Sequence, residues 1–345
     1  MQRFCLTLTL GIAATTFLGT FAGFAQDGPY KVLKASKVGG DGRFDYVYAD
    51  EAGRKLYVAR RGPDRVSVYN LDTIELAGEI ANTSAAGAAV STKSGHGFAS
   101  SKPVAMWDTK TLATIKTIDV EGGPDGIMHD PFNDRVYIFS HRAPNVTVIN
   151  AADGAVLGTI DLGGAPEQAA TDGKGHIYVD IEDKGNIAVI DAKTMAVTAH
   201  YDLEGKGGQC AGLALDVKNQ ILFATCRNPQ TMVILNAKDG KIITTLPIGQ
   251  GTDGAVFNPR TMEAFSSQGD GTLTIVKEKS PMDFVVEQNL ETMKTAKTLT
   301  LDSKTGHILL IAAEFGAPAN PPPAGGRAGR GQMVPDSFSI LVVGK

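Results

Sequence analysis

A short apolar run, usually with a central aromatic residue, recurs seven times along this chain of 345 residues. The steps between successive central residues, from Tyr57 to Leu309, are 41, 39, 41, 45, 42 and 44 residues. Self-similarity at a period of 20–50 residues is typical of repeat architectures. The seven runs are Lys55–Ala59, His96–Ser100, Arg135–Phe139, His176–Asp180, Ile221–Thr225, Glu263–Ser267 and His307–Ile311.

Each repeat contains further runs that alternate between apolar and polar residues, the pattern of a β-strand. Examples are the short run Asp125–Asp130 before an anchor, Asn145–Asn150 after it, and Val156–Leu162 after a further turn. Glycine, at 40 of 345 residues, exceeds the usual ~7% and suits many tight turns. Four strands in about 42 residues predict a propeller blade. The expected fold class is therefore all-β, a seven-bladed β-propeller with four-stranded blades.

The two ends of the chain complete one another in this scheme. The last repeat ends with Asp336–Lys345, which matches a third strand, whereas Tyr30–Val38 near the other end matches an outer fourth strand. We therefore expect the ring to be closed by an N-terminal strand that completes the last blade, which would pair otherwise open edges. Residues 26–345 are then one domain.

Residues 1–25 are predicted to be a secretory signal peptide, with Arg3 as the only charge before Asp27 and small residues before Gln26. The alternative is a transmembrane anchor. No later apolar stretch reaches 18 residues, so no membrane span is expected after cleavage. The predicted location is periplasmic or secreted. The net charge of −4 and the single tryptophan argue against nucleic-acid binding.

The segments Leu56–Arg60 and Val66–Thr73, which read LYVAR and VSVYNLDT, resemble the YVTN-repeat, or YncE-like, family of bacterial propellers. The resemblance extends over nearly the whole mature chain. It implies an exported seven-bladed propeller. Neighbouring propellers include lactone hydrolases and subunits of quinoprotein amine dehydrogenases, but no catalytic motif of those enzymes is recognisable here. One fold hosts many functions, so the resemblance implies no activity.

The repeat separates residues that serve every blade from residues that occur once. Asp or Asn ends the first strand of most blades, where it can cap a turn; these residues are Asp50, Asp130, Asp172, Asp216, Asn258 and Asp302. His96, His176 and His307 recur at another turn position and form no metal set. His129 occupies a strand position that the other blades fill with Ala, Val, Thr, Leu or Phe, which favours a core histidine over a ligand. No zinc motif is present.

One repeat position opens the innermost strand and should face a mouth of the central channel. It holds Asp45, Ala86, Asp125, Glu167, Ala211, Asp253 and Lys297. Loops leaving the second strand should lie on the same face and carry Arg60, Arg61, Lys102, His141, Arg142, Glu182, Asp183 and Arg227. Two interpretations remain: the charges pair across blades and close the ring, or they bind a ligand, since an arginine fork suits carboxylate or phosphate. The candidate ligand-binding residues are Asp45, Arg60, Arg61, Asp125, His141, Arg142, Glu167, Arg227 and Asp253.

Cys210 and Cys226 remain after signal cleavage and flank a predicted hairpin centred near residue 218. An antiparallel pair would place them nearly opposite one another, within disulfide range, in an oxidising compartment. We predict a disulfide; a redox pair is the alternative, although Cys-x-x-Cys spacing is lacking.

Residues 317–335 form a Pro/Gly-rich insertion in the last blade with two arginines, Arg327 and Arg330. The composition predicts an extended loop on the same face as the mouth. It is either a tolerated surface insertion or a lid or partner-docking arm.

These observations favour an exported, monomeric binding or scaffold protein that recognises a small polar ligand or a protein partner at the channel mouth. The alternative is a lactonase-like hydrolase or lyase with Asp125, His141 and Glu167 as acid/base residues. No cofactor is predicted, although a divalent cation could assist either function.

Overall fold

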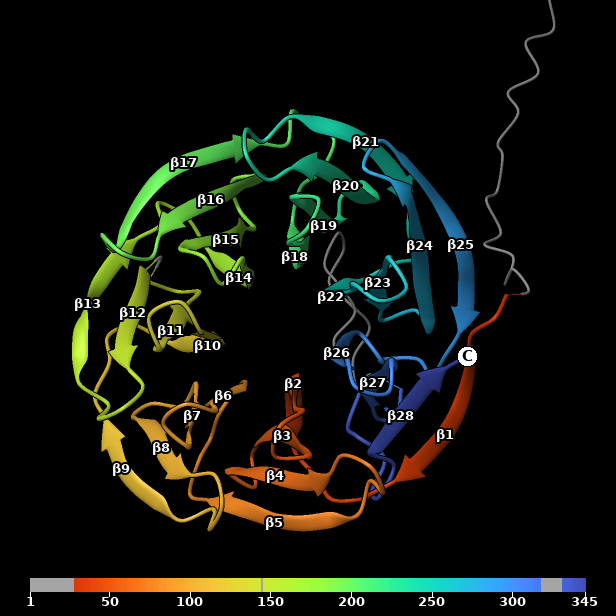
Figure 1. Cartoon of the computed structure of the whole chain (residues 1–345). Coiled ribbons are helices and arrows are strands. Elements are labelled where there is room, and N and C mark those ends of the chain that lie inside the picture. The colour runs from red at the N-terminus through yellow and green to blue at the C-terminus, as the bar shows by residue number, and fades with distance from the viewer. Residues whose placement is uncertain (1–27, 144, 318–330) are drawn as a thin grey trace, which may run out of the picture.

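The computed structural model describes residues 28–143, 145–317 and 331–345. Over these residues the chain forms 28 strands and no helix, in seven antiparallel sheets of four strands each. The sheets are arranged in a ring, with β2, β6, β10, β14, β18, β22 and β26 as the innermost strands (Figure 1). The predicted all-β, seven-bladed propeller is confirmed. Within the described ranges, no helix is long and apolar enough to cross a membrane.

The blades are numbered in chain order, and their strands are given from the channel outward. Blade 1 contains β2 (Arg43–Asp50), β3 (Lys55–Arg61), β4 (Arg65–Asn70) and β5 (Leu76–Ala81). Blade 2 contains β6 (Ala88–Ser91), β7 (His96–Ala99), β8 (Val104–Asp108) and β9 (Thr114–Ile118). Blade 3 contains β10 (Pro124–Asp130), β11 (Arg135–Ser140), β12 (Asn145–Asn150) and β13 (Val156–Asp161). Blade 4 contains β14 (Pro166–Thr171), β15 (His176–Ile181), β16 (Asn186–Asp191) and β17 (Ala196–Asp202). Blade 5 contains β18 (Cys210–Asp216), β19 (Ile221–Arg227), β20 (Gln230–Asn236) and β21 (Ile242–Pro247). Blade 6 contains β22 (Thr252–Asn258), β23 (Glu263–Gln268), β24 (Thr272–Ser280) and β25 (Asp283–Glu291). Blade 7 contains β26 (Thr298–Asp302), β27 (His307–Ala312), β28 (Ser339–Gly344) and β1 (Lys31–Lys37).

Blade 7 joins the two ends of the chain. Strand β1 pairs antiparallel with β28, from Lys31 opposite Gly344 to Lys37 opposite Ser339. The N-terminal strand is therefore the outermost strand of the last blade, as the sequence predicted (Figure 1). The predicted signal peptide at residues 1–25 and most of the loop at 317–335 lie outside the described residues.

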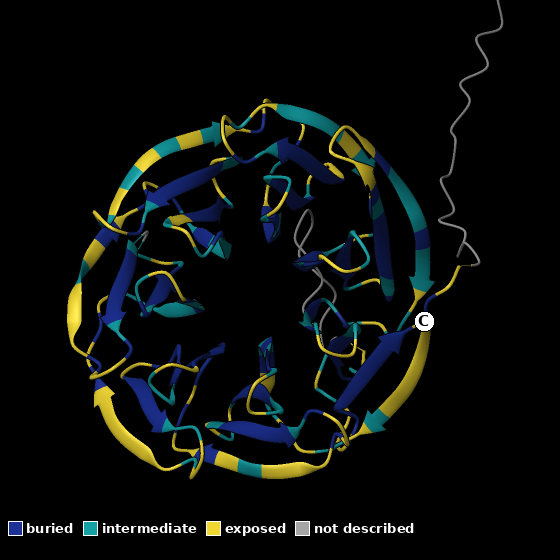
Figure 2. Ribbon diagram, in the orientation of Figure 1, coloured by how far each residue is buried: buried dark blue, intermediate teal, exposed yellow. Residues whose placement is uncertain are grey.

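The core lies between the blades rather than inside any one of them. In blade 1, Leu56 and Val58 pack toward blade 7, whereas Tyr57 and Val68 pack toward blade 2. Both faces of the second and third strands are thus buried, which explains why their sequences are almost continuously apolar. The outer strands have one face in solvent, and Figure 2 shows the resulting exposed rim around a buried interior.

The turn and disulfide predictions are both confirmed locally. Asp50 Oδ1 accepts a hydrogen bond of 2.9 Å from the backbone N–H of Gly53, and Asn258 acts in the same way. Cys210 and Cys226 face each other directly in the register of β18 and β19, and they are joined by a disulfide. The pairing follows from the tight hairpin between the two strands, which fixes their register.

Candidate functional site

The acidic residues of the channel mouth sit at an irregularity shared by several innermost strands. The register shifts between Phe44 and Val47 in β2, and corresponding shifts enclose the acidic residues of β10, β14 and β22. A bulge inserts an unpaired residue and turns its side chain away from the regular pleat. The shifts therefore lie where Asp45, Asp125, Glu167 and Asp253 open their strands.

A chain of ion pairs runs around much of this mouth. Lys297 Nζ lies 3.4 Å from Asp45 Oδ1 and also pairs with Asp253. Arg227 binds Asp253 through one guanidinium nitrogen and Glu182 through the other, at 2.5 Å in the second case. These ion pairs therefore connect blade 1 through blades 7, 6 and 5 to blade 4. These contacts fit the interpretation that the charges help to close the ring.

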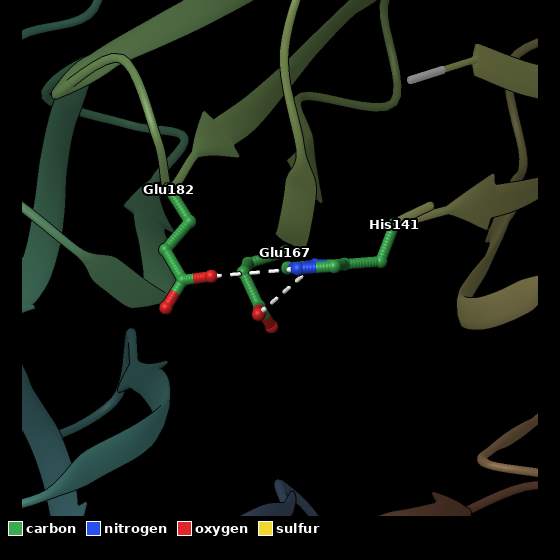
Figure 3. Close-up of side chains that lie close together, drawn as sticks. All are labelled: His141, Glu167 and Glu182. Carbon is green, nitrogen blue, oxygen red and sulfur yellow. Dashed lines mark ion pairs between the residues drawn. The ribbon is translucent and has the colours of Figure 1, made fainter. Parts of the chain in front are cut away.

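The series of ion pairs continues to His141, which lies next to two glutamates. His141 Nε2 lies 3.6 Å from Glu182 Oε2, and Nδ1 lies 3.4 Å from Glu167 Oε1. Figure 3 shows both carboxylates at the nitrogen-bearing end of the imidazole, each joined to it by an ion pair. The hydroxyl of Tyr46 donates to the other oxygen of Glu167 at 3.3 Å. His141 comes from the end of blade 3, whereas both glutamates belong to blade 4.

One further ion pair at the mouth joins blades 1 and 3, which lie on either side of blade 2. The residue of blade 2 at the corresponding position is Ala86, which carries no charge. Arg61 of blade 1 instead reaches Asp125 of blade 3, with Nη2 3.1 Å from Oδ1. The small side chain leaves room for a long one to cross.

Crowding of the carboxylates changes their protonation. Burial raises the pKa of Asp125 to about 6, assisted by the negative charges of Asp45 and Glu167 and opposed by Arg61. The pKa of His141 is raised to about 9, chiefly by its interaction with Glu167. A carboxyl whose pKa lies near neutrality and a paired imidazole are the groups that proton transfer requires.

These side chains line a cavity of about 490 Å³ at the mouth. Three carboxyl residues, Asp125, Glu167 and Glu182, line it together with His141. Four cationic residues also line it: Arg61, Lys102, Arg142 and Arg227. The cavity is thus lined by charged side chains of both signs, and its guanidinium groups come from three blades.

The sequence-based candidates divide into three groups. Asp125, His141, Glu167, Arg61, Arg142 and Arg227 share the cavity. Asp45 and Asp253 lie in the ion-pair chain beside it. Arg60 is placed elsewhere: it is buried, lies 3.8 Å above the ring of Phe338 and donates to the backbone of Asp41. Successive residues of a strand point to opposite faces, so Arg60 and its neighbour Arg61 point to opposite sides of the blade.

Asp180, near the mouth, was not among the residues predicted to lie there. Asp180 on β15 is fully buried, and neither of its carboxylate oxygens has a hydrogen-bond partner within the described part of the chain. Burial raises its pKa well above the usual range, and the charge of Glu167 adds to this. The repeat contained the signal, because other blades carry an uncharged residue at this position: Ala59, Ser100, Phe139, Thr225, Ser267 and Ile311.

Comparisons with known proteins identify the fold but no relative. No family model matches the chain, and no curated protein matches its sequence. Among solved structures, a chain of one described as "Crystal Structure of Mitotic Checkpoint Complex" superposes with a TM-score of 0.68 at 13% identity. The match covers 89% of this chain and 95% of that chain. At this identity the likeness shows the fold alone.

Proposed function

We propose that this protein is an exported binding protein of the YVTN-repeat type that holds a small polar anion in the cavity at the channel mouth. The fold commonly serves binding or scaffold roles. The observation that carries the proposal is the cavity of about 490 Å³ with four cationic side chains in its lining. Ligand pockets in proteins fall mostly between about 300 and 1,000 Å³.

The charged lining favours a carboxylate or phosphate group over an apolar ligand. Arg61 and Arg142 offer planar forks, which bind such groups through two parallel hydrogen bonds. Arg227 is already engaged by Glu182 and Asp253, so it helps to shape the wall. The Arg61 side chain is 40% exposed and pairs with Asp125 through Nη2, so the guanidinium group can also reach a ligand.

The proposal is tested by thermal-shift and calorimetric screening of the mature protein against di- and tricarboxylates and sugar phosphates, with EDTA present. Binding should raise the melting temperature in proportion to the logarithm of ligand concentration. Arg61→Gln should weaken binding at least tenfold. Arg260→Gln is the matched control, because Arg260 is exposed at the far end of β22. Failure of every anion to bind, or equal loss in both variants, would contradict the proposal.

A hydrolase or lyase is the second candidate, because Asp125, His141 and Glu167 line the same cavity. The His141–Glu167 contact of 3.4 Å is suited to moving a proton during ring opening of a lactone or elimination from a hydroxy acid. Turnover of simple lactones that disappears in His141→Gln but persists in His176→Gln would support this candidate. Binding without turnover would favour the binding protein.

A further inference from the structure

We propose that His141, Glu167 and Glu182 bind a first-row divalent metal ion, such as Zn²⁺ or Mn²⁺, in the wall of the mouth cavity. The ion's role in holding an anion rests on the proposed function. Binding of the ion itself rests only on these three side chains, which come from adjacent blades and meet at one point of the ring.

The spacing of the donor atoms supports the site. One donor atom from each residue lies within 4.8 Å of the other two. Some point is then no farther than about 2.8 Å (4.8 Å divided by √3) from all three atoms, whereas metal–ligand distances are about 2.0–2.2 Å. The three side chains therefore need to move by less than about 1 Å to surround one ion, which rotation of their terminal torsions can supply.

Each carboxylate is also oriented in the manner of a metal ligand. Glu167 uses Oε2 to accept from the hydroxyl of Tyr46 and presents Oε1 to His141. Glu182 uses Oε1 to accept from Arg227 and presents Oε2 to His141. In both residues one oxygen is fixed by a neighbour while the other faces the shared gap (Figure 3). Outer partners that orient the ligands are a regular feature of metal sites.

The donor set selects the class of ion. An imidazole nitrogen with two carboxylate oxygens suits Zn²⁺ or Mn²⁺. Calcium prefers six to eight oxygen ligands, so one nitrogen and two carboxylates suit it poorly. Three protein ligands leave further coordination positions, and these would open into a cavity that is also lined by Arg61 and Arg142. An anion bound there would meet the ion at one end and a guanidinium group at the other.

The experiment titrates metal into EDTA-stripped, untagged mature protein without any organic anion. Isothermal calorimetry with Zn²⁺, and the loss of free Mn²⁺ signal in electron paramagnetic resonance, should both show one site per chain, with Ca²⁺ much weaker. Glu167→Gln and His141→Gln should each weaken Zn²⁺ binding at least tenfold. Glu204→Gln, on an exposed turn, and His176→Gln, at the exposed start of β15, are matched controls, and each should bind Zn²⁺ as the parent protein does.

Circular dichroism melting without metal shows whether each variant folds. If Glu167→Gln does not fold, His141→Gln decides the question. The metal site would be overturned if no one-to-one binding is found, or if Glu167→Gln and His141→Gln weaken binding no more than the control variants do. The cluster would then be an imidazole paired with two carboxylates. Because the anion screen is done in EDTA and this titration without anions, either proposal can fail without the other.

Discussion

Blade 2 packs a tryptophan against a glycine at a position where the other blades pair two larger residues. Gly97 of β7 lies directly opposite Trp107 of β8, and a β-carbon added to Gly97 would overlap the indole ring. The indole is completely buried. The corresponding pairs in blades 1, 3, 4 and 5 are Leu56 with Tyr69, Val136 with Ile149, Ile177 with Ile190 and Leu222 with Leu235. The glycine therefore makes room for the tryptophan.

Substitution of either residue alone should destabilise the fold, and substitution of both should destabilise it by less than the sum of the two losses. Gly97→Val overpacks the interface, at a cost of about 2–3 kcal/mol. Trp107→Ile leaves a cavity, at a cost of about 2–3 kcal/mol. The double variant recreates the Val–Ile pair of blade 3 and should recover about 2 kcal/mol or more of the summed loss, because contacting residues are not additive.

Melting followed by circular dichroism measures these effects. Each single variant should lower the melting temperature by roughly 3–6 °C, and the double variant should regain at least half of the combined loss. Trp107 is the only tryptophan, so its emission directly reports displacement of the indole in Gly97→Val. An unchanged emission maximum and melting temperature in Gly97→Val, or strictly additive losses in the double variant, would refute the reasoning.

Three further predictions concern contacts that stabilise the blades and the closure of the ring. Replacing both Cys210 and Cys226 by Ala should lower the free energy of unfolding by about 3 kcal/mol, since the disulfide closes a loop of 16 residues. Thiol titration of the unfolded, unreduced parent should find no free thiol in the mature chain. Burial opposes ionisation of Asp302, but hydrogen bonds from Arg54 outweigh it and hold the pKa of the carboxyl below 3.8. The ionised Asp302 therefore stabilises the fold above about pH 4, and this contribution is lost on acidification. In urea titrations, the free energy of unfolding should fall less for Asp302→Asn than for the parent between pH 5 and 3. Tyr30 is buried against blade 6 and donates to a buried glutamate, so Tyr30→Ala should cost about 3 kcal/mol and expose β1 to limited proteolysis; unchanged proteolysis would contradict this.

The fold was predictable because its determinants are local in the sequence. Alternation with a period of two marked each strand, and the spacing of the anchors marked each blade. Lys55–Ala59 and its six counterparts therefore coincide with second strands, with Ser100 alone lying one residue beyond its strand, β7. The same register identified the positions that open the innermost strands, including Asp125 and Glu167. Short hairpins also fixed the pairing of Cys210 with Cys226.

Contacts at the mouth could be predicted only as a gathering of charges, not as pairs. Residues 26 or more positions apart meet there, and which of them touch depends on the curvature of the ring and the length of each side chain. Arg61 passes over blade 2 to Asp125, a contact that Ala86 permits. Glu182 belongs to the loop after β15 and completes the histidine cluster, although it was outside the candidate set.

The sequence by itself determined the seven blades, their four strands, the closure by an N-terminal strand and the disulfide, because each follows from periodicity or from a short turn. The tertiary structure alone decided that Arg60 is buried while Arg61 faces the cavity, that Asp180 has no hydrogen-bond partner among the described residues, and that His141 lies between two glutamates. Side-chain direction and inter-blade distance control these features, and the periodicity of the repeats specifies neither of them.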